Sequence, residues 1–299
     1  MNAEAVKITP SMVRSLLSRR RKDTTKRDYG HLLIVGGSGH MLGAVLLAAR
    51  GASRSGCGLV SVACAASVRA FVYAHMAEAL TLGLRETAEG DIDAGNAPDL
   101  VAYMKDRKVT ALVLGPGLGR GVETLRFARD LMRKTCVPCV IDADAIEEAV
   151  VTAGMGFKAV TPHKGEFARL TGLAMRQMSG TGYGVCADYA KRHLATVLLL
   201  KGHESKVFYG DRVWMNPTGN PGMAKGGSGD VLSGIMGSLL AQRFVTVTDN
   251  DGLLPCVLAA TYLHGLAGDV AAKSMGQYSM TPGDIIRFLP QAIRRITKG

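Results

Sequence analysis

The sequence predicts an α/β fold with a central, mostly parallel sheet that helices cover on both faces. Three observations support this prediction. Apolar runs of strand length alternate with longer segments of helical periodicity along the 299 residues. Most of these runs end in a cluster of Gly, Asp, His or Lys, as at the carboxyl ends of parallel strands. No linker or repeat interrupts the pattern, so we expect one domain at 30–299 behind a basic extension at 1–29.

The apolar pattern places the elements in chain order. A helix at 11–17 precedes a basic loop, and a buried strand at 31–35 runs into the glycine-rich turn at 36–39. Further strands are expected at 59–64, 111–114, 137–141, 158–160 and 196–200, with a hairpin of 207–209 and 212–214. Further helices are expected at 42–55, 228–242, 253–272 and 284–296.

Three kinds of partner would explain the net charge of +11: nucleic acid, an acidic membrane surface, or small polyanions such as nucleotides. The dense basic run is Arg19 to Lys22, with Lys26 and Arg27 close behind. It has no interleaved aromatic residues, so we expect a solvated segment and no nucleic-acid binding. Small anionic ligands are the favoured partners.

Cysteine content and the N-terminus indicate a soluble cytoplasmic protein. Cys136 and Cys139 form a CxxC, but an apolar strand follows it where a redox motif would open a helix. We expect all six cysteines to be reduced core thiols. The N-terminus lacks a signal pattern, and no uninterrupted apolar run reaches the roughly 18 residues of a membrane helix.

The strongest motif is the segment from Asn216 to Asp230, NPTGNPGMAKGGSGD, which precedes a helix. Glycines near its end let successive backbone N–H groups point inward, and the helix start adds the positive end of its dipole. Together they predict an anion hole for a transferring phosphoryl group. Asp230 in the first helical turn can accept the proton of an attacking hydroxyl. The alternative, a plain loop with Asp230 as a cap, is disfavoured by five glycines between 219 and 229.

Other strand-end clusters leave two interpretations open. His163 in TPHKGEF either caps the next helix together with Glu166 or donates to a polar substrate. The segment Lys201 to Ser205 is either a turn or the lip of a nucleotide site. Asp142 and Asp144 either cap the sheet edge or order water and metal. His264 lies on a strongly apolar helix, where a hydrogen-bonded core histidine is favoured.

Two common nucleotide fingerprints are absent or weak. The turn GGSG at 36–39 meets the G-x-G-x-x-G spacing loosely, and no acidic residue follows the next strand. The P-loop pattern ending in Gly-Lys-Ser/Thr does not occur, which disfavours a P-loop kinase.

In order, the motifs GGS…GA, SGCGLV, LGPGLG, DADA, TPHKGEF, LKGH, NPTGNPGMAKGGSGDVLSG and LHGLAGD resemble the ADP- or ATP-dependent NAD(P)H-hydrate dehydratases. The match runs from about Gly30 to Pro290. This resemblance implies a ribokinase-like fold with no separate lid domain. It also implies repair of hydrated NADH or NADPH (the S epimer). In the reaction that the resemblance implies, phosphorylation of the ring hydroxyl by ADP or ATP, with Mg²⁺ on the donor, precedes elimination of phosphate.

The resemblance also implies roles for individual residues. Asp230 is the catalytic base, and the amides of Gly227 to Gly229 hold the phosphoryl charge. The residues expected to line the hydrated dinucleotide are Ala44, Gly117, His163 and Asp230. The residues expected at the nucleotide are Lys201, Gly202, His203, Glu204, Ser205, Asn220 and Gly229. No protein side chain is assigned to a metal, and a homo-oligomer, a tetramer, is implied.

Three positions depart from the family pattern. Lys225 replaces a small residue or Thr, and its cation could bind phosphate or alter donor choice. Leu42 replaces a small polar residue near Ala44, and Ser205 replaces Thr. The alternative functions are a hydroxyethylthiazole-type small-molecule kinase and a non-catalytic nucleotide-binding regulator. The family's upstream epimerase domain is not expected within the 29 residues before the first motif.

Overall fold

The computed structural model describes residues 5–17, 19–178 and 183–298. Within these residues, one 10-stranded sheet has the order β1-β10-β9-β8-β7-β6-β5-β2-β3-β4. The strands are β1 (Val6–Lys7), β2 (His31–Val35), β3 (Leu59–Ala65), β4 (Leu80–Leu84), β5 (Ala111–Leu114), β6 (Cys139–Ile141), β7 (Lys158–Val160), β8 (Thr196–Leu200), β9 (Lys206–Tyr209) and β10 (Arg212–Met215). Neighbours from β8 to β4 all run parallel, and β9 is antiparallel to β8 and β10. The predicted mostly parallel sheet is confirmed.

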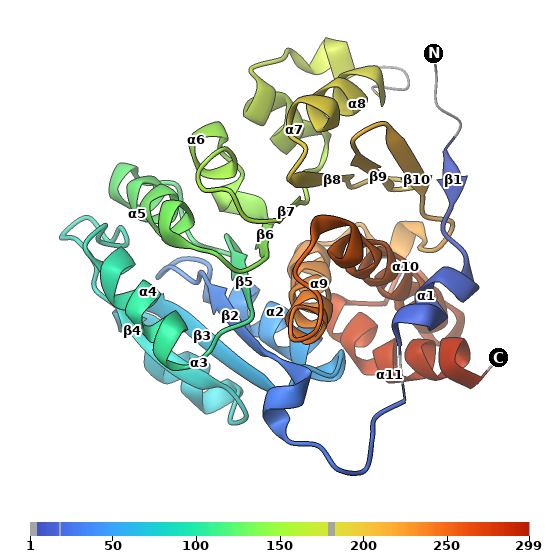
Figure 1. The fold of residues 1–299 in the computed structure, drawn as a ribbon, viewed down its shortest axis with the longest axis horizontal. Coiled ribbons are helices and arrows are strands. Elements are labelled where there is room, and N and C mark those ends of the chain that lie inside the picture. The colour runs from blue at the N-terminus through green and yellow to red at the C-terminus, as the bar shows by residue number, and fades with distance from the viewer. Residues whose placement is uncertain (1–4, 18, 179–182, 299) are drawn as a thin grey trace.

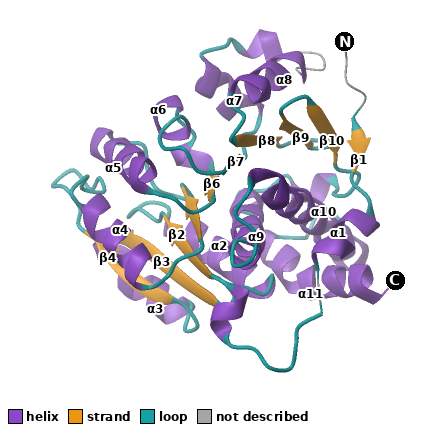
Figure 2. Ribbon diagram, in the orientation of Figure 1, coloured by secondary structure: helices purple, strands orange, loops and turns teal. Residues whose placement is uncertain are grey.

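Helices lie on both faces of this sheet, as predicted. They are α1 (Pro10–Leu16), α2 (Leu42–Arg54), α3 (Arg69–His75), α4 (Asn96–Asp106), α5 (Val122–Lys134), α6 (Glu148–Val151), α7 (Lys164–Thr171), α8 (Tyr183–Arg192), α9 (Ser228–Arg243), α10 (Asn250–Met275) and α11 (Pro282–Lys298). Figure 1 shows α2, α9, α10 and α11 together on one side of the strands, with α4 to α8 along the other. Figure 2 shows the strands as the layer between them.

Burial explains why the central strands read as continuous apolar runs. All five residues of β2 are buried, and so are all five of β8. A parallel strand between two helical layers has no solvent face, so apolar residues follow one another instead of alternating with polar ones. Central strands are therefore easier to predict from the sequence than edge strands.

The edge elements depart from the sequence prediction. Strand β4 and the two-residue β1 were not predicted, because β4 is partly exposed, contains Gly83 and lacks a long apolar run. Strand β6 begins at Cys139, two residues later than expected, since Pro138 supplies a carbonyl to Leu112 but has no N–H for the ladder. Helices α3 to α6 and α8 were not predicted either.

Helix α10 is the one described helix long and apolar enough to cross a membrane by length and composition. It extends the predicted apolar segment at both ends, so the expectation that no such segment exists needs qualification. However, 78% of its most apolar window is buried inside the structure, where α10 packs against α1, α9 and α11. This is the burial of a core helix in a globular protein.

The cysteines are free thiols, but they are not all in the core. Cys64, Cys139, Cys186 and Cys256 are buried, Cys57 is half-buried and Cys136 is exposed. Burial raises the pKa of the Cys57 thiol to about 11, which keeps it protonated near neutral pH. The prediction of a core position is therefore wrong for Cys136, which lies before β6 in the loop after α5.

Part of the basic N-terminal extension packs onto the fold. Strand β1 adds to the sheet parallel to β10, with Lys7 beside Met215, and Ile8 donates its N–H to the Met215 carbonyl at 2.9 Å. Ile8 and Val13 are buried, which anchors β1 and α1. Residues 1–4 and 18 of the extension lie outside the described residues, and its boundary at Gly30 stays a prediction.

Candidate active site

A cavity of about 940 Å³ opens where β6, β7 and β8 end and α9 begins. Its size falls within the range of small-molecule sites. It brings together ten of the residues predicted to bind or catalyse, from four separate segments of the chain. These are His163, Lys201, Gly202, His203, Glu204, Ser205, Asn220, Gly227, Gly229 and Asp230.

Ala44 and Gly117 do not line this cavity, but they lie against each other. A Cβ on Gly117 would lie 3.1 Å from the Ala44 Cβ and 2.3 Å from the Met41 carbonyl oxygen. Gly117 also has a φ of +59°, so a side chain is excluded twice, by conformation and by space. The contact joins the start of α2 to the turn after β5, and the substrate role of both residues stays a prediction.

The glycine-rich segment before α9 has the backbone geometry of an anion hole. Gly227 caps the helix with a φ of +94°, a conformation that favours glycine, and a Cβ there would meet Leu47 at 2.5 Å. Among the described residues, the amides of Gly229 and Asp230 have no hydrogen-bond partner. They are the free N–H groups of a helix start, and they lie at the cavity.

His264 fixes the position of this helix start from behind. Its Nε2 lies 2.9 Å from the carbonyl oxygen of Ser228, and the ring is buried. Burial lowers the pKa of His264 to about 4, so the ring is neutral and Nε2 carries the donated proton. The expected hydrogen-bonded core histidine is confirmed, and its acceptor belongs to the first residue of α9.

A fully satisfied carboxylate, Asp142, lies beneath the anion hole. Lys201 Nζ donates to Asp142 Oδ1 at 2.9 Å, and two hydroxyls, one directly after β7 and one from α9, complete its hydrogen bonds. These are Thr161 Oγ1 to Oδ1 at 2.7 Å and Ser233 Oγ to Oδ2 at 2.5 Å. Burial opposes ionisation, but Lys201 and the two hydroxyls hold the pKa of Asp142 below its usual value. Asp142 is thus an ion-paired anchor, an assignment that neither sequence interpretation included.

The ammonium of Lys201 lies close to the start of α9. Its ammonium also lies 3.5 Å from Glu166, and a Cβ on Gly229 would be 3.4 Å from Lys201 Nζ. Burial lowers the pKa of Lys201, but the carboxylates of Asp142 and Glu166 outweigh it and raise the pKa above the usual value. The ammonium therefore stays charged beside the free amides, where an anionic group would bind.

Asp230 has the opposite environment to Asp142. Within the described part of the chain, its carboxylate has neither a hydrogen bond nor an ion pair, and it lines the cavity. Burial raises the pKa of Asp230 to about 7, repulsion from Asp142 adds to the shift, and Lys201 opposes it. Two neighbouring carboxylates whose pKa values are pushed apart mark a structural anion and a proton acceptor.

His163 is a helix cap whose ring also reaches the cavity. Its Nδ1 accepts from the N–H groups of Gly165 at 3.0 Å and Glu166 at 3.1 Å. Glu166 returns the interaction by accepting from the His163 N–H at 2.8 Å, which completes a capping box. Because Nδ1 accepts two N–H groups, Nε2 is the ring nitrogen that can donate, and it lies 3.5 Å from Glu166 Oε1 at the cavity. The cap is confirmed, and the side chain is 60% exposed at the cavity.

The two loops assigned to the nucleotide are held in shape by their own hydrogen bonds. Ser205 Oγ donates to the Gly202 carbonyl at 3.0 Å, and Glu204 has a φ of +51° within the same turn. Asn220 donates to Asp269 at 3.0 Å, and its Oδ1 accepts from the Gly222 N–H at 3.0 Å. The Asn220 side chain therefore ties its loop to α10, while the residue itself borders the cavity.

Lys225 does not offer a free cation to a phosphate. Its ammonium donates to the main-chain carbonyls of Tyr278 at 2.8 Å and Met280 at 2.5 Å. These bonds attach the glycine-rich loop to the segment before α11. Two of the three ammonium N–H groups are thus taken by the main chain, and a role of this cation at a phosphate stays a prediction.

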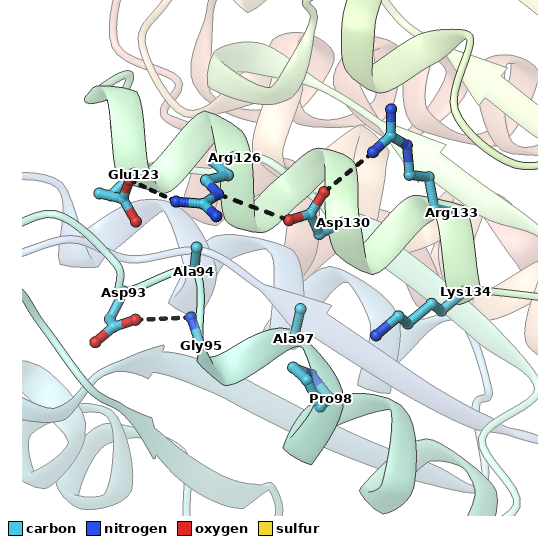
Figure 3. Close-up of a pocket in the computed structure, with 10 residues that line it drawn as sticks. All are labelled: Asp93, Ala94, Gly95, Ala97, Pro98, Glu123, Arg126, Asp130, Arg133 and Lys134. Atoms are coloured by element: carbon cyan, nitrogen blue, oxygen red, sulfur yellow. Dashed lines mark hydrogen bonds and ion pairs between the residues drawn. The ribbon is translucent and has the colours of Figure 1, made fainter.

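A second cavity, of about 430 Å³, lies between α4 and α5 (Figure 3). Figure 3 shows Arg126 pointing toward Glu123 and Asp130, and Arg133 toward Asp130. These ion pairs run along one helix face, as i,i+3 and i,i+4 spacing allows. None of the predicted site residues is among the described residues that line this cavity, so the larger cavity is the candidate active site.

Sequence reasoning did not find the Asp142–Lys201–Ser233 network or the position of Lys7 at the cavity wall. Lys201 and Asp142 are 59 residues apart in the sequence. Ser233 lies on α9, one helical turn after Asp230, the last residue of the glycine-rich motif. The signal for Asp142 was the Asp-rich end of its strand. No sequence signal pointed to Lys7.

Comparison with known proteins agrees with this geometry. A family model for NAD(P)H-hydrate dehydratase matches residues 32–291. The bifunctional NAD(P)H-hydrate repair enzyme of Moorella thermoacetica is 39% identical over 97% of this chain and 54% of its own length. The chain thus spans about half the length of such bifunctional relatives. The ADP-dependent (S)-NAD(P)H-hydrate dehydratase of Lactiplantibacillus plantarum is 32% identical, with 97% of this chain and 98% of that protein covered.

Solved structures give the same result for the fold. An ADP/ATP-dependent NAD(P)H-hydrate dehydratase from Bacillus subtilis, co-crystallised with ATP and Mg²⁺, matches with a TM-score of 0.80 and 29% identity over 99% of both chains. A ribokinase-like protein from Enterococcus faecalis matches with a TM-score of 0.80 at 24% identity over 99% of this chain and 97% of its own, which confirms the ribokinase-like fold. The chain belongs to the NAD(P)H-hydrate dehydratase family.

Proposed function

We propose that this protein dehydrates hydrated NADH or NADPH, the S epimer, in a reaction driven by ADP or ATP. The observation that carries the proposal is the pairing of an unpartnered carboxylate, Asp230, with the free amides at the start of α9 in one cavity. The carboxylate suits proton removal, and the amides suit a transferring phosphoryl group. Family membership supplies the substrate, since the relatives are named for it.

The proposed first step is phosphorylation of the ring hydroxyl. Asp230 takes the hydroxyl proton as the oxygen attacks the terminal phosphorus of the donor, and the bond from that phosphorus to the donor breaks. The amides of Gly229 and Asp230, with the ammonium of Lys201 beside them, stabilise the charge on the phosphoryl oxygens. The amide of Gly227 belongs to the same proposed hole.

The proposed second step restores the dihydropyridine ring. The C–O bond to the new phosphate ester breaks, phosphate leaves with the electron pair, and the neighbouring ring carbon loses a proton as the double bond forms. Hydroxide would be a poor leaving group in the same reaction. The net change converts the donor and the hydrate into the shortened nucleotide, phosphate and NAD(P)H.

Mg²⁺ fits this cavity as part of a metal–nucleotide complex. Glu204 presents a carboxylate that has no partner among the described residues, whereas both oxygens of Asp142 are occupied and Asp230 is reserved for the substrate proton. One or two carboxylates together with substrate phosphates are the usual Mg²⁺ environment. When bound, the ion would reduce the negative charge of the donor phosphates.

We expect the whole protein to be a cytoplasmic homotetramer. Light scattering would check the number of subunits.

The direct test is restoration of dihydronicotinamide absorbance from hydrated NADH, with ADP and ATP run side by side. We expect nucleotide-dependent recovery of absorbance with equimolar release of phosphate. Phosphorylation of hydroxyethylthiazole without activity on the hydrate would instead favour a vitamin kinase. Nucleotide binding without turnover of any hydrated cofactor would favour a regulator.

The pH dependence of this reaction should report Asp230. A base with a pKa of about 7 is protonated and inactive below that pH and becomes active above it. We therefore expect kcat/KM to rise about tenfold per pH unit below about 7 and to level off above it, since kcat/KM reports the free enzyme. A profile that is flat between about pH 5.5 and 8 would contradict the assignment.

Replacement of His163 should separate its two roles. For His163→Ala we expect the KM for hydrated NADH to rise about tenfold, with ADP affinity retained and helix α7 destabilised by ~1 kcal/mol. Asn is a good N-cap, so His163→Asn should regain the stability and keep the raised KM. Equal losses for hydrate and nucleotide would count against a place at the substrate.

A further inference from the structure

Lys7 lies on the wall of the active-site cavity, although it comes from the N-terminal segment outside the matched region 32–291. Its position follows from strand pairing. Neighbouring residues of paired strands project to the same face of a sheet, and Lys7 pairs with Met215, which also lines the cavity. The hydrogen bond from Ile8 to Met215 and the burial of Ile8 fix this register.

The other lysines at the cavity are already engaged by the protein. Lys201 is paired with Asp142 and Glu166, and Lys225 donates to two main-chain carbonyls. Within the described residues, the side chain of Lys7 has no hydrogen bond, ion pair or ring contact, and it is exposed. It is therefore the lysine at this cavity whose charge remains available to a ligand.

The residues next to Lys7 indicate which ligand group its ammonium would bind. Met215 pairs in turn with Lys206, and the Asn216 N–H donates to the Ser205 carbonyl at 2.9 Å. Strand β10 therefore separates Lys7 from the end of the turn Lys201 to Ser205, and Lys7, Met215 and Ser205 border the same cavity. This turn is the one assigned above to the phosphoryl donor, and the donor carries its charge on phosphates. A flexible ammonium at the rim suits a phosphate as a point charge.

We propose that Lys7 binds a phosphate of the donor nucleotide and thereby sets the affinity for ADP and ATP. This inference rests on the proposed function for the identity of the donor. It makes the N-terminal strand part of the nucleotide site, with β1 acting as the support that holds the cation at the rim.

The test is calorimetric titration of ADP and ATP into the full chain carrying Lys7→Met, Lys7→Arg or the control Lys105→Met. Lys105 is an exposed lysine of α4, away from the cavity. For Lys7→Met we expect the Kd for both nucleotides to rise about tenfold, as for loss of a charged hydrogen bond. Arg should restore affinity to within about threefold, and the loss should shrink at high salt. The KM for hydrated NADH should stay within about twofold.

Three results would overturn the assignment: an ADP Kd for Lys7→Met within about twofold of the wild type, an equal loss for the hydrated substrate, or an equal loss in Lys105→Met. Failure of the wild type to bind either nucleotide would also overturn it. Binding is measured without turnover, so a wild type that binds ADP but never dehydrates the hydrate would refute the proposed function and leave the Lys7 result standing. Melting curves show whether each variant is folded.

Discussion

Replacing Asp230 with Asn should lower the turnover of hydrated NADH by at least about 10²–10⁴-fold, the usual contribution of a general base. The amide has nearly the same shape but cannot take the hydroxyl proton. The free amides at the start of α9 and the ammonium of Lys201 remain, so the Kd for ADP should change by less than about threefold. Single-turnover absorbance and calorimetry measure the two quantities separately.

The same variant should also change stability in a pH-dependent way. The pKa of Asp230 is about 7 in the folded chain, above the ordinary 3.8, so ionisation of this carboxylate opposes folding. Asp230→Asn should therefore melt at a higher temperature than the wild type at pH 8, and the difference should close as the pH falls toward 4. Asp188→Asn, an exposed carboxylate on α8, is the control and should show neither effect. Near-normal turnover in Asp230→Asn would refute the catalytic role.

Replacing Lys201 with Met should destabilise the fold by about 3–5 kcal/mol, because it leaves the buried carboxylate of Asp142 without its counter-ion. The folded pKa of Asp142 is below 3.8 and that of Lys201 is above 10.5, so the pair is charged and stabilising between these values. The contribution of Asp142 is lost as the pH falls through its lowered pKa, and that of Lys201 as the pH rises through its raised pKa. Urea unfolding at pH 7 measures the loss.

A double variant distinguishes the loss of a charge partner from the loss of packing. Asp142→Asn removes the carboxylate charge that Lys201→Met leaves without a counter-ion. The new amide can still form hydrogen bonds with Thr161 and Ser233. The double variant with Lys201→Met should therefore be more stable than Lys201→Met alone. In addition, the deficit of Lys201→Met should shrink as the pH is lowered and Asp142 takes up a proton. A deficit independent of pH, with no recovery in the double variant, would mean that the pair contributes through packing only.

These two predictions depend on different parts of the site, and the sequence revealed them unequally. The five glycines between 219 and 229 indicated a helix start with free amides, because glycine is favoured where the backbone takes a positive φ or approaches a ligand closely. The partner of Lys201 lies 59 residues away, so no local pattern could indicate it. Its identity depends on β6 and β8 each ending at the same edge of the sheet, separated by β7.

The sequence by itself determined the central strands, the start of α9 and the membership of His163, Lys201 and Asp230 in one edge of the sheet. Fully buried strands and glycine turns leave local signals, because backbone hydrogen bonding and φ restrict which residues can stand there. Only the tertiary structure decided the protonation of Asp230, the engagement of Lys225 and the place of Lys7. These depend on burial and on charges brought together from distant segments, and neither is encoded by neighbours along the chain.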